Sequence, residues 1–414
     1  MTDFQVAAIL LSLTALLAYV NARVLRLPSA IGLMATALLG SLIVLGLDAL
    51  SITDVAPRVK ALLDHVNLSY ALLHAMLGIL LFAGALHVEL DDLREYKLAI
   101  AVLSVGGTAL STILVSAVTY LALAALGTPL SYIYCLLFGA LISPTDPIAV
   151  LGILRAAKTP KSLEVTITGE SLFNDGVGVV IFLAVFGVAS GGDVDLGAIG
   201  RSFIQEAVGG AVFGIVLGYI GFRMLRSIDQ YSVEILITLA MVLGGYAAAE
   251  AVHVSAPIAA VTAGLLIGNQ GRALAMSDTT RDHLDTFWEL IDEILNAVLF
   301  LLIGLELIHL ELSFKLLIAA IAIVPLVLLA RFVSVAIPML AMPRYRRKVP
   351  GALPLLTWGG LRGGISVALA LSIPPGDERP VILAITYGVV VFSILVQGTT
   401  LGWLARRLRR GEAA

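Results

Sequence analysis

The sequence has little charge and almost no cysteine. Of its 414 residues, 13% are charged and 59% are hydrophobic, whereas about 25% of the residues of ordinary soluble domains are charged. The apolar runs leave no segment for a folded soluble domain, and no nucleic-acid partner is expected. The single cysteine, Cys135, lies in an apolar run, which excludes an intramolecular disulfide and a Cys-rich metal site. No resident cofactor is predicted.

Long apolar runs make up most of the chain. Runs of roughly 20 residues are long enough to cross a hydrocarbon core about 30 Å thick as helices. The first run has no basic residue before it and no cleavage signal after it, so we interpret it as a retained helix. The pattern predicts an all-α polytopic membrane protein of about 13 transmembrane helices, near residues 4–22, 28–47, 67–87, 98–126, 131–154, 163–187, 202–222, 231–251, 256–270, 286–308, 314–340, 351–373 and 380–403.

Lys and Arg are unevenly distributed between the loops of this arrangement. Nineteen of the 26 lie in one alternate set of loops or in the basic tail at 404–414, and only Arg58, Lys60, Arg201, Lys315 and Arg379 lie in the other. Because cytoplasmic loops carry the excess of Lys and Arg, the N-terminus is predicted outside and the C-terminus in the cytoplasm. The predicted location is the cell (inner) membrane, with the lipid bilayer as a partner.

Helix breakers interrupt two of the predicted spans. Span 131–154 contains Ser143-Pro144-Thr145-Asp146-Pro147, and span 351–373 contains four glycines around Arg362. A proline removes a backbone hydrogen bond and clashes with the preceding turn, so both spans are predicted to be broken helices.

The broken helices occupy matching places in two halves of the chain. Residues 1–187 and 231–403 each supply six predicted helices, and residues 188–230 supply a linker helix between them. Broken helices at corresponding positions are typical of an inverted-repeat secondary transporter, whose ion site lies where the two breaks cross. The whole chain is therefore interpreted as one membrane transport unit.

Span 163–187 carries charged and polar residues in its middle. Ser171 and Asp175 are four residues apart and share one helix face, while Glu170 and Asn174 share the adjacent face. Ionisable residues inside a membrane are costly and mark ion or proton pathways. A carboxylate, a hydroxyl and carbonyls freed at a broken helix suit a hard monovalent cation. We predict that Asp175 takes part in transport; the alternative is a structural hydrogen-bond network.

Asp146 has two possible roles. It lies between two prolines at the first break, where a carboxylate would offset the positive partial charge of half-helix N-termini. It could also contact the transported ion directly.

Glu170 and Arg362 are predicted to form a buried structural ion pair. Their estimated depths are similar, and such a pair is costly to break on one side only.

The remaining intramembrane polar residues are given structural roles. Arg331 is predicted to pair with Asp292 or Glu293 of the preceding span, and Asn296 to cap or bridge helices.

Four stretches resemble the bacterial NhaP-type branch of the cation:proton antiporter superfamily, which also includes the animal sodium/hydrogen exchangers. They are GALISPTDPIAVLGIL, TGESLFNDGVGVVIF, FWELIDEILNAVLFLLIGLEL and WGGLRGGISVALALSIP. The resemblance implies a thirteen-helix fold with two broken, crossing helices, a six-helix core domain, a dimerisation domain and a homodimer. It also implies exchange of Na⁺ or Li⁺ for H⁺ by alternating access, so the chain is expected to be a transporter and not an enzyme.

The resemblance also implies residue roles. The ion- and proton-binding set would comprise Asp175, Asn174, Ser171, Thr145 and Asp146, with cation and proton competing at Asp175. Asp175, Ser171 and Thr145 would contact the monovalent cation. An Asn-Asp pair at positions 174 and 175 resembles the electroneutral branch, which exchanges one proton for each cation.

Two further positions bear on the resemblance. Glu170 with Arg362 matches the family's core ion pair. Ala83 departs from the pattern, because related archaeal sequences carry a glutamate at this position of the third helix. Ala83 cannot coordinate an ion, so the resemblance implies a cation shell that differs from that of the archaeal relatives.

Three alternatives stay open at the level of the sequence. The first is a K⁺/H⁺ antiporter of the same fold. The second is an intramembrane aspartyl protease that uses Asp146 and Asp175, although its Gly-x-Gly-Asp stretch is missing. The third is a channel or a non-transporting sensor, for which no pore or signalling domain is visible.

Overall fold

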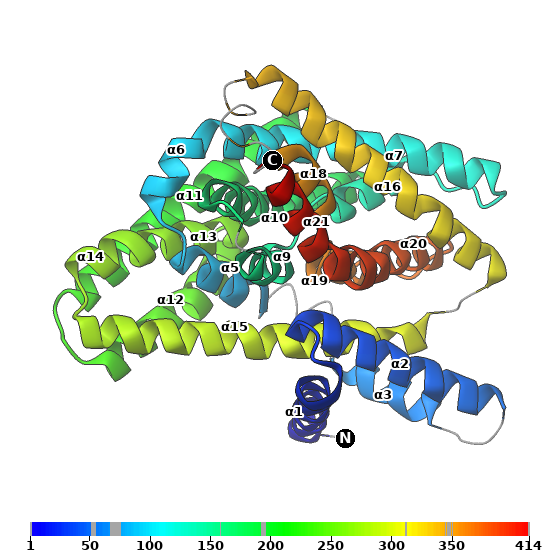
Figure 1. The fold of residues 1–414 in the computed structure, drawn as a ribbon, viewed down its shortest axis with the longest axis horizontal. Coiled ribbons are helices and arrows are strands. Elements are labelled where there is room, and N and C mark those ends of the chain that lie inside the picture. The colour runs from blue at the N-terminus through cyan, green and yellow to red at the C-terminus, as the bar shows by residue number, and fades with distance from the viewer. Residues whose placement is uncertain are drawn as a thin grey trace.

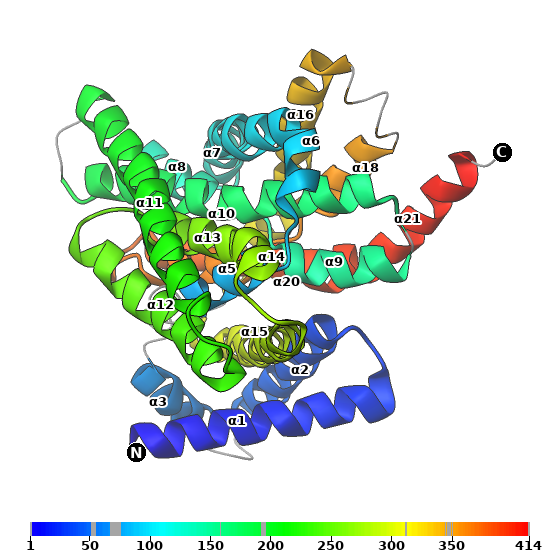
Figure 2. The ribbon, with the colours of Figure 1, turned by 90° about the vertical axis from the view of Figure 1, so that its left-hand side faces the viewer.

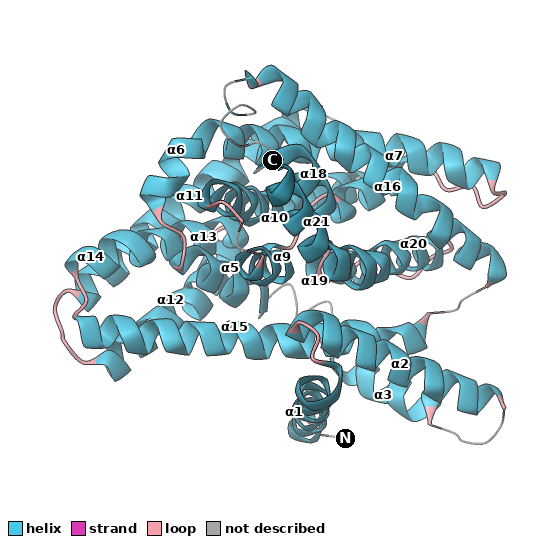
Figure 3. Ribbon diagram, in the orientation of Figure 1, coloured by secondary structure: helices cyan, strands magenta, loops and turns pink. Residues whose placement is uncertain are grey.

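The computed structural model describes residues 2–50, 55–66, 76–157, 159–191, 196–310, 313–343, 345, 349 and 351–412. Every regular element in these ranges is a helix (Figures 1 and 3). The first half forms α1 (Asp3–Val20), α2 (Ser29–Ala49), α3 (Ala56–Val66), α5 (Leu77–Leu86), α6 (Leu90–Ala101), α7 (Thr108–Ala125), α8 (Tyr132–Ile142), α9 (Pro147–Ala156) and α10 (Lys161–Ala189).

The second half continues in the same way. Its helices are α11 (Leu196–Leu225), α12 (Tyr231–Ala251), α13 (Ala256–Leu266), α14 (Arg272–Leu274), α15 (Asp278–Glu306), α16 (Phe314–Ala341), α18 (Ala352–Trp358), α19 (Gly364–Leu371), α20 (Arg379–Phe392) and α21 (Gly398–Glu412). Short π-helical segments extend several of the long helices: η1 (Asn21–Leu25), η3 (Val102–Gly107), η4 (Ile267–Gly271) and η6 (Ser393–Gln397).

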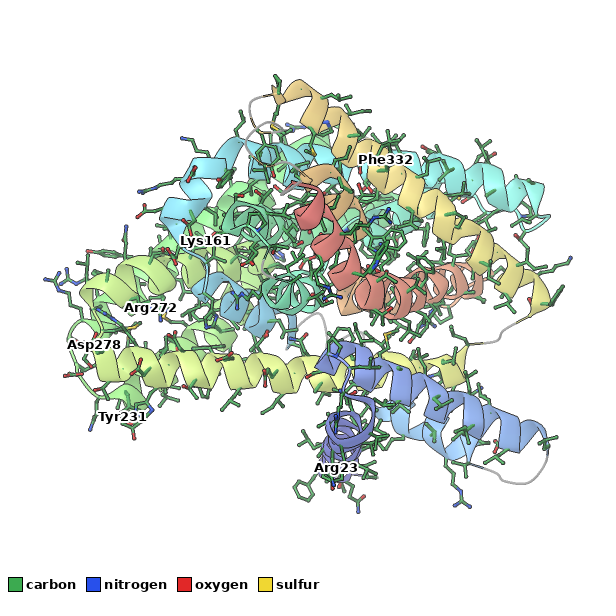
Figure 4. All side chains as sticks on the ribbon, in the orientation of Figure 1. Arg23, Lys161, Tyr231, Arg272, Asp278 and Phe332 are labelled. Carbon is green, nitrogen blue, oxygen red and sulfur yellow. The ribbon has the colours of Figure 1, made fainter. Side chains whose placement is uncertain are left out.

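Helix length and apolar composition identify a multi-pass membrane protein. Eight helices in the described ranges are long and apolar enough to cross a membrane, and α5 and α8 are shorter apolar helices. Apolar side chains also cover the outer surface; Phe332 on α16, for example, is 45% exposed (Figure 4). The predicted fold class is confirmed, whereas the count of 13 spans stays a prediction.

Charged residues begin several of the helices. Lys161, Arg272 and Asp278 are the first residues of α10, α14 and α15 (Figure 4). Lys161 forms ion pairs with Glu89 and Asp92, which places the start of α6 beside the start of α10. The distribution of basic residues predicts that positions 94, 97 and 161 share one side of the membrane, and this proximity agrees with that arrangement.

One helix lies where the apolar pattern predicts a loop. The segment Ala56–Val66 forms α3, an amphipathic helix with one buried apolar edge at Leu63. Its charged residues interrupt any long apolar run, so the apolar pattern of the sequence does not predict this helix. Residues 67–75 of the predicted third span lie outside the described residues, and the described part of that span is α5.

The helices surround α10. This helix packs against α6, α8, α9, α11, α13 and α19. α1, α2 and α3 lie together at one edge of the molecule, with α15 between them and the rest of the bundle (Figure 2). The polar middle of α10 therefore lies at the centre of the protein, away from its lipid-facing surface.

Both predicted breaks are present. α8 ends at Ile142 and α9 begins at Pro147, while α18 ends at Trp358 and α19 begins at Gly364. The prolines and glycines recognised in the sequence fall between these half-helices or, as Pro147 and Gly364, at the first residue of the second one. Each break therefore lies where the backbone properties of its residues predict it.

Candidate ion-binding site

The two breaks are in direct contact. The backbone N–H of Asp146 donates to the carbonyl of Leu361 at 2.8 Å. Gly363 lies so close to Asp146 that a Cβ added there would overlap the carboxylate oxygen Oδ2. Segments more than 200 residues apart in the chain are thus joined by main-chain contacts, as expected for crossing broken helices.

Charged side chains lie at the half-helix ends that they stabilise. Arg362 Nη1 donates to the carbonyls of Ser143 and Pro144 at 2.5 and 2.8 Å, just beyond the C-terminus of α8. Asp146 directly precedes α9 and approaches Gly363, the residue before α19. Carbonyls at a helix C-terminus attract a cation and helix N-termini attract an anion. The predicted compensation by Asp146 therefore fits the geometry, and Arg362 performs the opposite task.

A hydrogen-bond network connects α10 to the first break. Asn174 accepts a hydrogen bond from the backbone N–H of Thr145 at 3.2 Å, and its Nδ2 donates to Thr145 Oγ1 at 2.9 Å. The hydroxyls of Thr145 and Ser171 lie 2.8 Å apart. Both polar groups of the Asn174 side chain are therefore engaged in holding the break against α10.

The predicted ion pair between Glu170 and Arg362 is wrong. Glu170 pairs instead with Arg331 of α16, through bonds of 2.6 and 2.9 Å from the two Nη atoms. Arg331 also donates to the carbonyl of Leu356 in α18. Glu170, Arg331 and Arg362 are each at most 2% exposed, and the basic residue that lies beside Glu170 is the one from α16.

The same contacts correct the prediction for Arg331. Asp292 and Glu293 lie on α15, which packs mainly against α2, α5 and α12. In Figure 1, α15 runs across the lower part of the molecule, whereas α16 slopes across its upper right. An estimate of depth along each helix could not separate these candidates, because it says nothing about which helices are neighbours.

Asp175 lies on a cavity of about 60 Å³. The polar side chains that line it belong to Asp175, Asp146, Asn296 and Ser366. Its other walls are mostly apolar or glycine, contributed by Leu77, Leu80, Leu81, Gly84, Pro144, Leu172, Leu299, Gly363, Gly364 and Ile365. The structure thus brings the two predicted carboxylates together beside one cavity.

Ser171 and Thr145 occupy a different position from the carboxylates. Neither lines the 60 Å³ cavity, and their hydroxyls bond to each other. Their assignment as cation ligands stays a prediction.

Ala83 does not face this cavity either. It belongs to an apolar cluster with Phe82, Leu86 and Trp288, on the opposite side of α5. The wall of α5 that faces Asp175 is made by Gly84 and three leucines. The residue whose loss was expected to alter the cation site therefore lies away from the cavity.

A larger cavity of about 540 Å³ adjoins the smaller one. Asp292, Glu293 and Arg406 are among the residues that line it, and Asn296 lines both cavities. The sequence led us to expect only a structural role for Asn296. The sequence did offer one indication that Asn296 lies beside the larger cavity. Asn296 follows Asp292 by four residues, and this spacing places both side chains on one face of α15.

The sequence is similar to known transporters over its whole length. The family model of the transmembrane sodium/hydrogen exchanger matches residues 11–407. The Na⁺/H⁺ antiporter NhaP of Pseudomonas aeruginosa is 52% identical over 413 residues, which cover 99% of this chain and 97% of the relative. The Na⁺/H⁺ antiporter NhaH of Halobacillus dabanensis is 34% identical, with 94% of this chain and 93% of the relative covered.

The fold is similar to a solved structure. The sodium proton antiporter MjNhaP1 of Methanocaldococcus jannaschii at pH 8 superposes with a TM-score of 0.74 and covers 97% of both chains, at 20% sequence identity. At this identity the similarity concerns the fold.

Proposed function

The chain belongs to the sodium/hydrogen exchanger family, and from this premise we propose that it is an antiporter that exchanges Na⁺ for H⁺ across the cell membrane. The observation that carries the proposal is the buried carboxylate of Asp175, which lines a cavity at the crossing of two broken helices. The relatives that cover nearly the whole chain are named Na⁺/H⁺ antiporters, which disfavours the protease alternative.

Cation and proton compete for the Asp175 carboxylate in the proposed mechanism. The carboxylate can bind either a proton or a cation, and the second carboxylate of Asp146 supplies further negative charge at the same cavity. A volume of about 60 Å³ holds a small cation together with a few water molecules, because one water requires at least about 10–15 Å³ of such space. The bound cation would therefore share its ligands between protein oxygens and water.

Alternating access completes the cycle. A single carboxylate that trades one proton for one Na⁺ or Li⁺ gives electroneutral one-to-one exchange. We propose that residues 1–187 and 231–403 are the two repeats, that α11 belongs to the linker between them, and that the protein acts as a homodimer with the C-terminus in the cytoplasm. Hydrogen bonds join α10 to the first break and the first break to the second, which supports movement of these helices as one unit.

The direct test is cation-driven proton movement in proteoliposomes. Addition of Na⁺ or Li⁺ is expected to drive protons across the membrane of vesicles that contain the native protein. The same measurement with K⁺ tests the alternative, a K⁺/H⁺ antiporter. Asp175→Asn removes the carboxylate at which cation and proton are proposed to compete and should abolish proton movement. Asp278→Asn is the matched control, because Asp278 is almost fully exposed at the start of α15, and it should exchange like the native protein.

Two outcomes of this test are decisive. Exchange that persists in folded Asp175→Asn would show that the carboxylate does not carry the ions. A transport rate that follows an imposed membrane potential would contradict one-to-one electroneutral exchange.

A further inference from the structure

Asn296 occupies the junction between the two cavities. It lies on α15 one helical turn after Asp292, and its side chain lines both the 540 Å³ cavity and the 60 Å³ cavity. The residue is only 6% exposed. A cation that passes from the acidic larger cavity to Asp175 would therefore meet the Asn296 amide on its way.

One half of that amide is bonded and the other half is not. Nδ2 donates to the backbone carbonyl of Asp292 at 2.8 Å. Because a carbonyl can only accept, this bond identifies the nitrogen and leaves Oδ1 as the remaining polar atom of the amide. Within the described part of the chain, Asn296 Oδ1 is buried without any hydrogen-bond partner.

An unpartnered buried oxygen is costly. Removing such a group from water without compensation costs roughly 1–3 kcal/mol, and buried polar atoms are nearly always bonded. A small hard cation would offset the cost, because amide oxygens are among its ordinary ligands. The other side-chain oxygens at this cavity come from Asp146, Asp175 and Ser366, and its remaining walls are mostly apolar or glycine.

We propose that Asn296 Oδ1 is a ligand of the transported monovalent cation at the entrance to the Asp175 cavity. The inference rests on the exchange function proposed above and extends it. An amide oxygen does not take up a proton in the physiological range, so Asn296 contributes to cation affinity and leaves proton binding to the carboxylates. The side chain thereby favours the cation in the competition at Asp175.

The test replaces Asn296 by leucine, which is similar in shape and lacks the oxygen, and by alanine, which adds no apolar bulk to the cavity. Initial rates of proton movement in proteoliposomes are measured against Na⁺ and Li⁺ concentration. We expect KM for both cations to rise about tenfold, which is the change that follows from losing about 1.4 kcal/mol of binding, while kcat stays within about twofold of the native value.

A second measurement does not depend on transport. A ligand that binds the folded state raises thermal stability in proportion to the logarithm of its concentration over Kd. Stabilisation of the detergent-solubilised variants by Na⁺ should therefore require about tenfold more Na⁺ than in the native protein.

Thr386→Val is the matched control. Thr386 Oγ1 is another buried oxygen without a hydrogen-bond partner in the described residues, and it lines neither of the two cavities. This variant should keep the native KM for Na⁺ and Li⁺.

The outcomes separate this inference from the function on which it rests. An unchanged KM and unchanged stabilisation by Na⁺ in both Asn296 variants would overturn the inference, as would loss of folded protein in both. Absence of cation-driven proton movement in the native protein would instead overturn the proposed exchange function.

Discussion

Removal of the Glu170 carboxylate should destabilise the protein severely. The Glu170 and Arg331 side chains are 1% and 3% exposed, and their charged atoms lie 2.6 and 2.9 Å apart. Two unit charges about 4 Å apart attract each other by ~4 kcal/mol at an effective dielectric constant of about 20. Glu170→Leu leaves the Arg331 charge buried with the Leu356 carbonyl as an acceptor, and we expect a loss of about 3–5 kcal/mol in the free energy of unfolding.

A double-mutant cycle measures how strongly Glu170 and Arg331 stabilise each other in the folded protein. The free energy of unfolding is obtained by titrating SDS into mixed micelles, for Glu170→Leu, Arg331→Met and the double variant. Because the double variant leaves no unpaired charge, it should be more stable than the sum of the single losses predicts, by about 2–4 kcal/mol. The same cycle with Arg362→Met should give a smaller coupling, because Arg362 donates its hydrogen bonds to Ser143 and Pro144.

The cycle can refute the assignment in two ways. A larger coupling with Arg362 than with Arg331 would restore the pairing predicted from the sequence. A coupling near zero with both arginines would show that burial of Glu170 is not governed by an ion pair.

Two further substitutions test the crossing. Gly363→Ala places a Cβ against Asp146 Oδ2, so the breaks must separate, and proton movement should fall at least about tenfold. Gly376→Ala is the control: Gly376 lies at an exposed turn with its nearest contact at 3.4 Å, and this variant should move protons at the native rate. An active Gly363→Ala would argue against the tight crossing. Thr145→Val removes the oxygen that bonds to Asn174 and Ser171 and should lower the free energy of unfolding by about 1–3 kcal/mol. The same SDS titration measures this loss. An unchanged free energy of unfolding would mean that this network does not hold the break.

Features that depend on local chemistry were predictable from the sequence. Prolines at 144 and 147 and the glycines around Arg362 each disrupt a helix by their own backbone properties, so both breaks can be located from the order of residues alone. The polar middle of α10 is likewise visible, because charge within an apolar run contrasts with its neighbours. The fold brings Asp146 and Asp175 to one cavity, as their estimated depths suggested.

Lateral arrangement could not be predicted in this way. Glu170 lies 9 residues from the start of α10 and Arg331 lies 10 from the end of α16, so their depths are similar, but Arg362 satisfied the same estimate. Only the packing of helices selects between them. The orientation of Ala83 and the free oxygen of Asn296 depend on helix rotation and on side-chain bonding, which a single sequence does not specify.

The kinds of contact around Asp175 have a mechanical consequence. Directional bonds join α10 to α16 through Glu170 and to the first break through Asn174, and Arg362 joins the second break to the first. Towards α5 and α15 the wall consists mainly of leucine, namely Leu77, Leu80, Leu81 and Leu299. Sliding one leucine surface past another exchanges many weak contacts for similar ones and breaks no hydrogen bond. The leucine contacts that α5 and α15 make with the crossing helices are therefore easier to exchange than the hydrogen bonds that hold α10 to α16 and to the first break, and a displacement at this boundary would move Asp175 relative to Asn296.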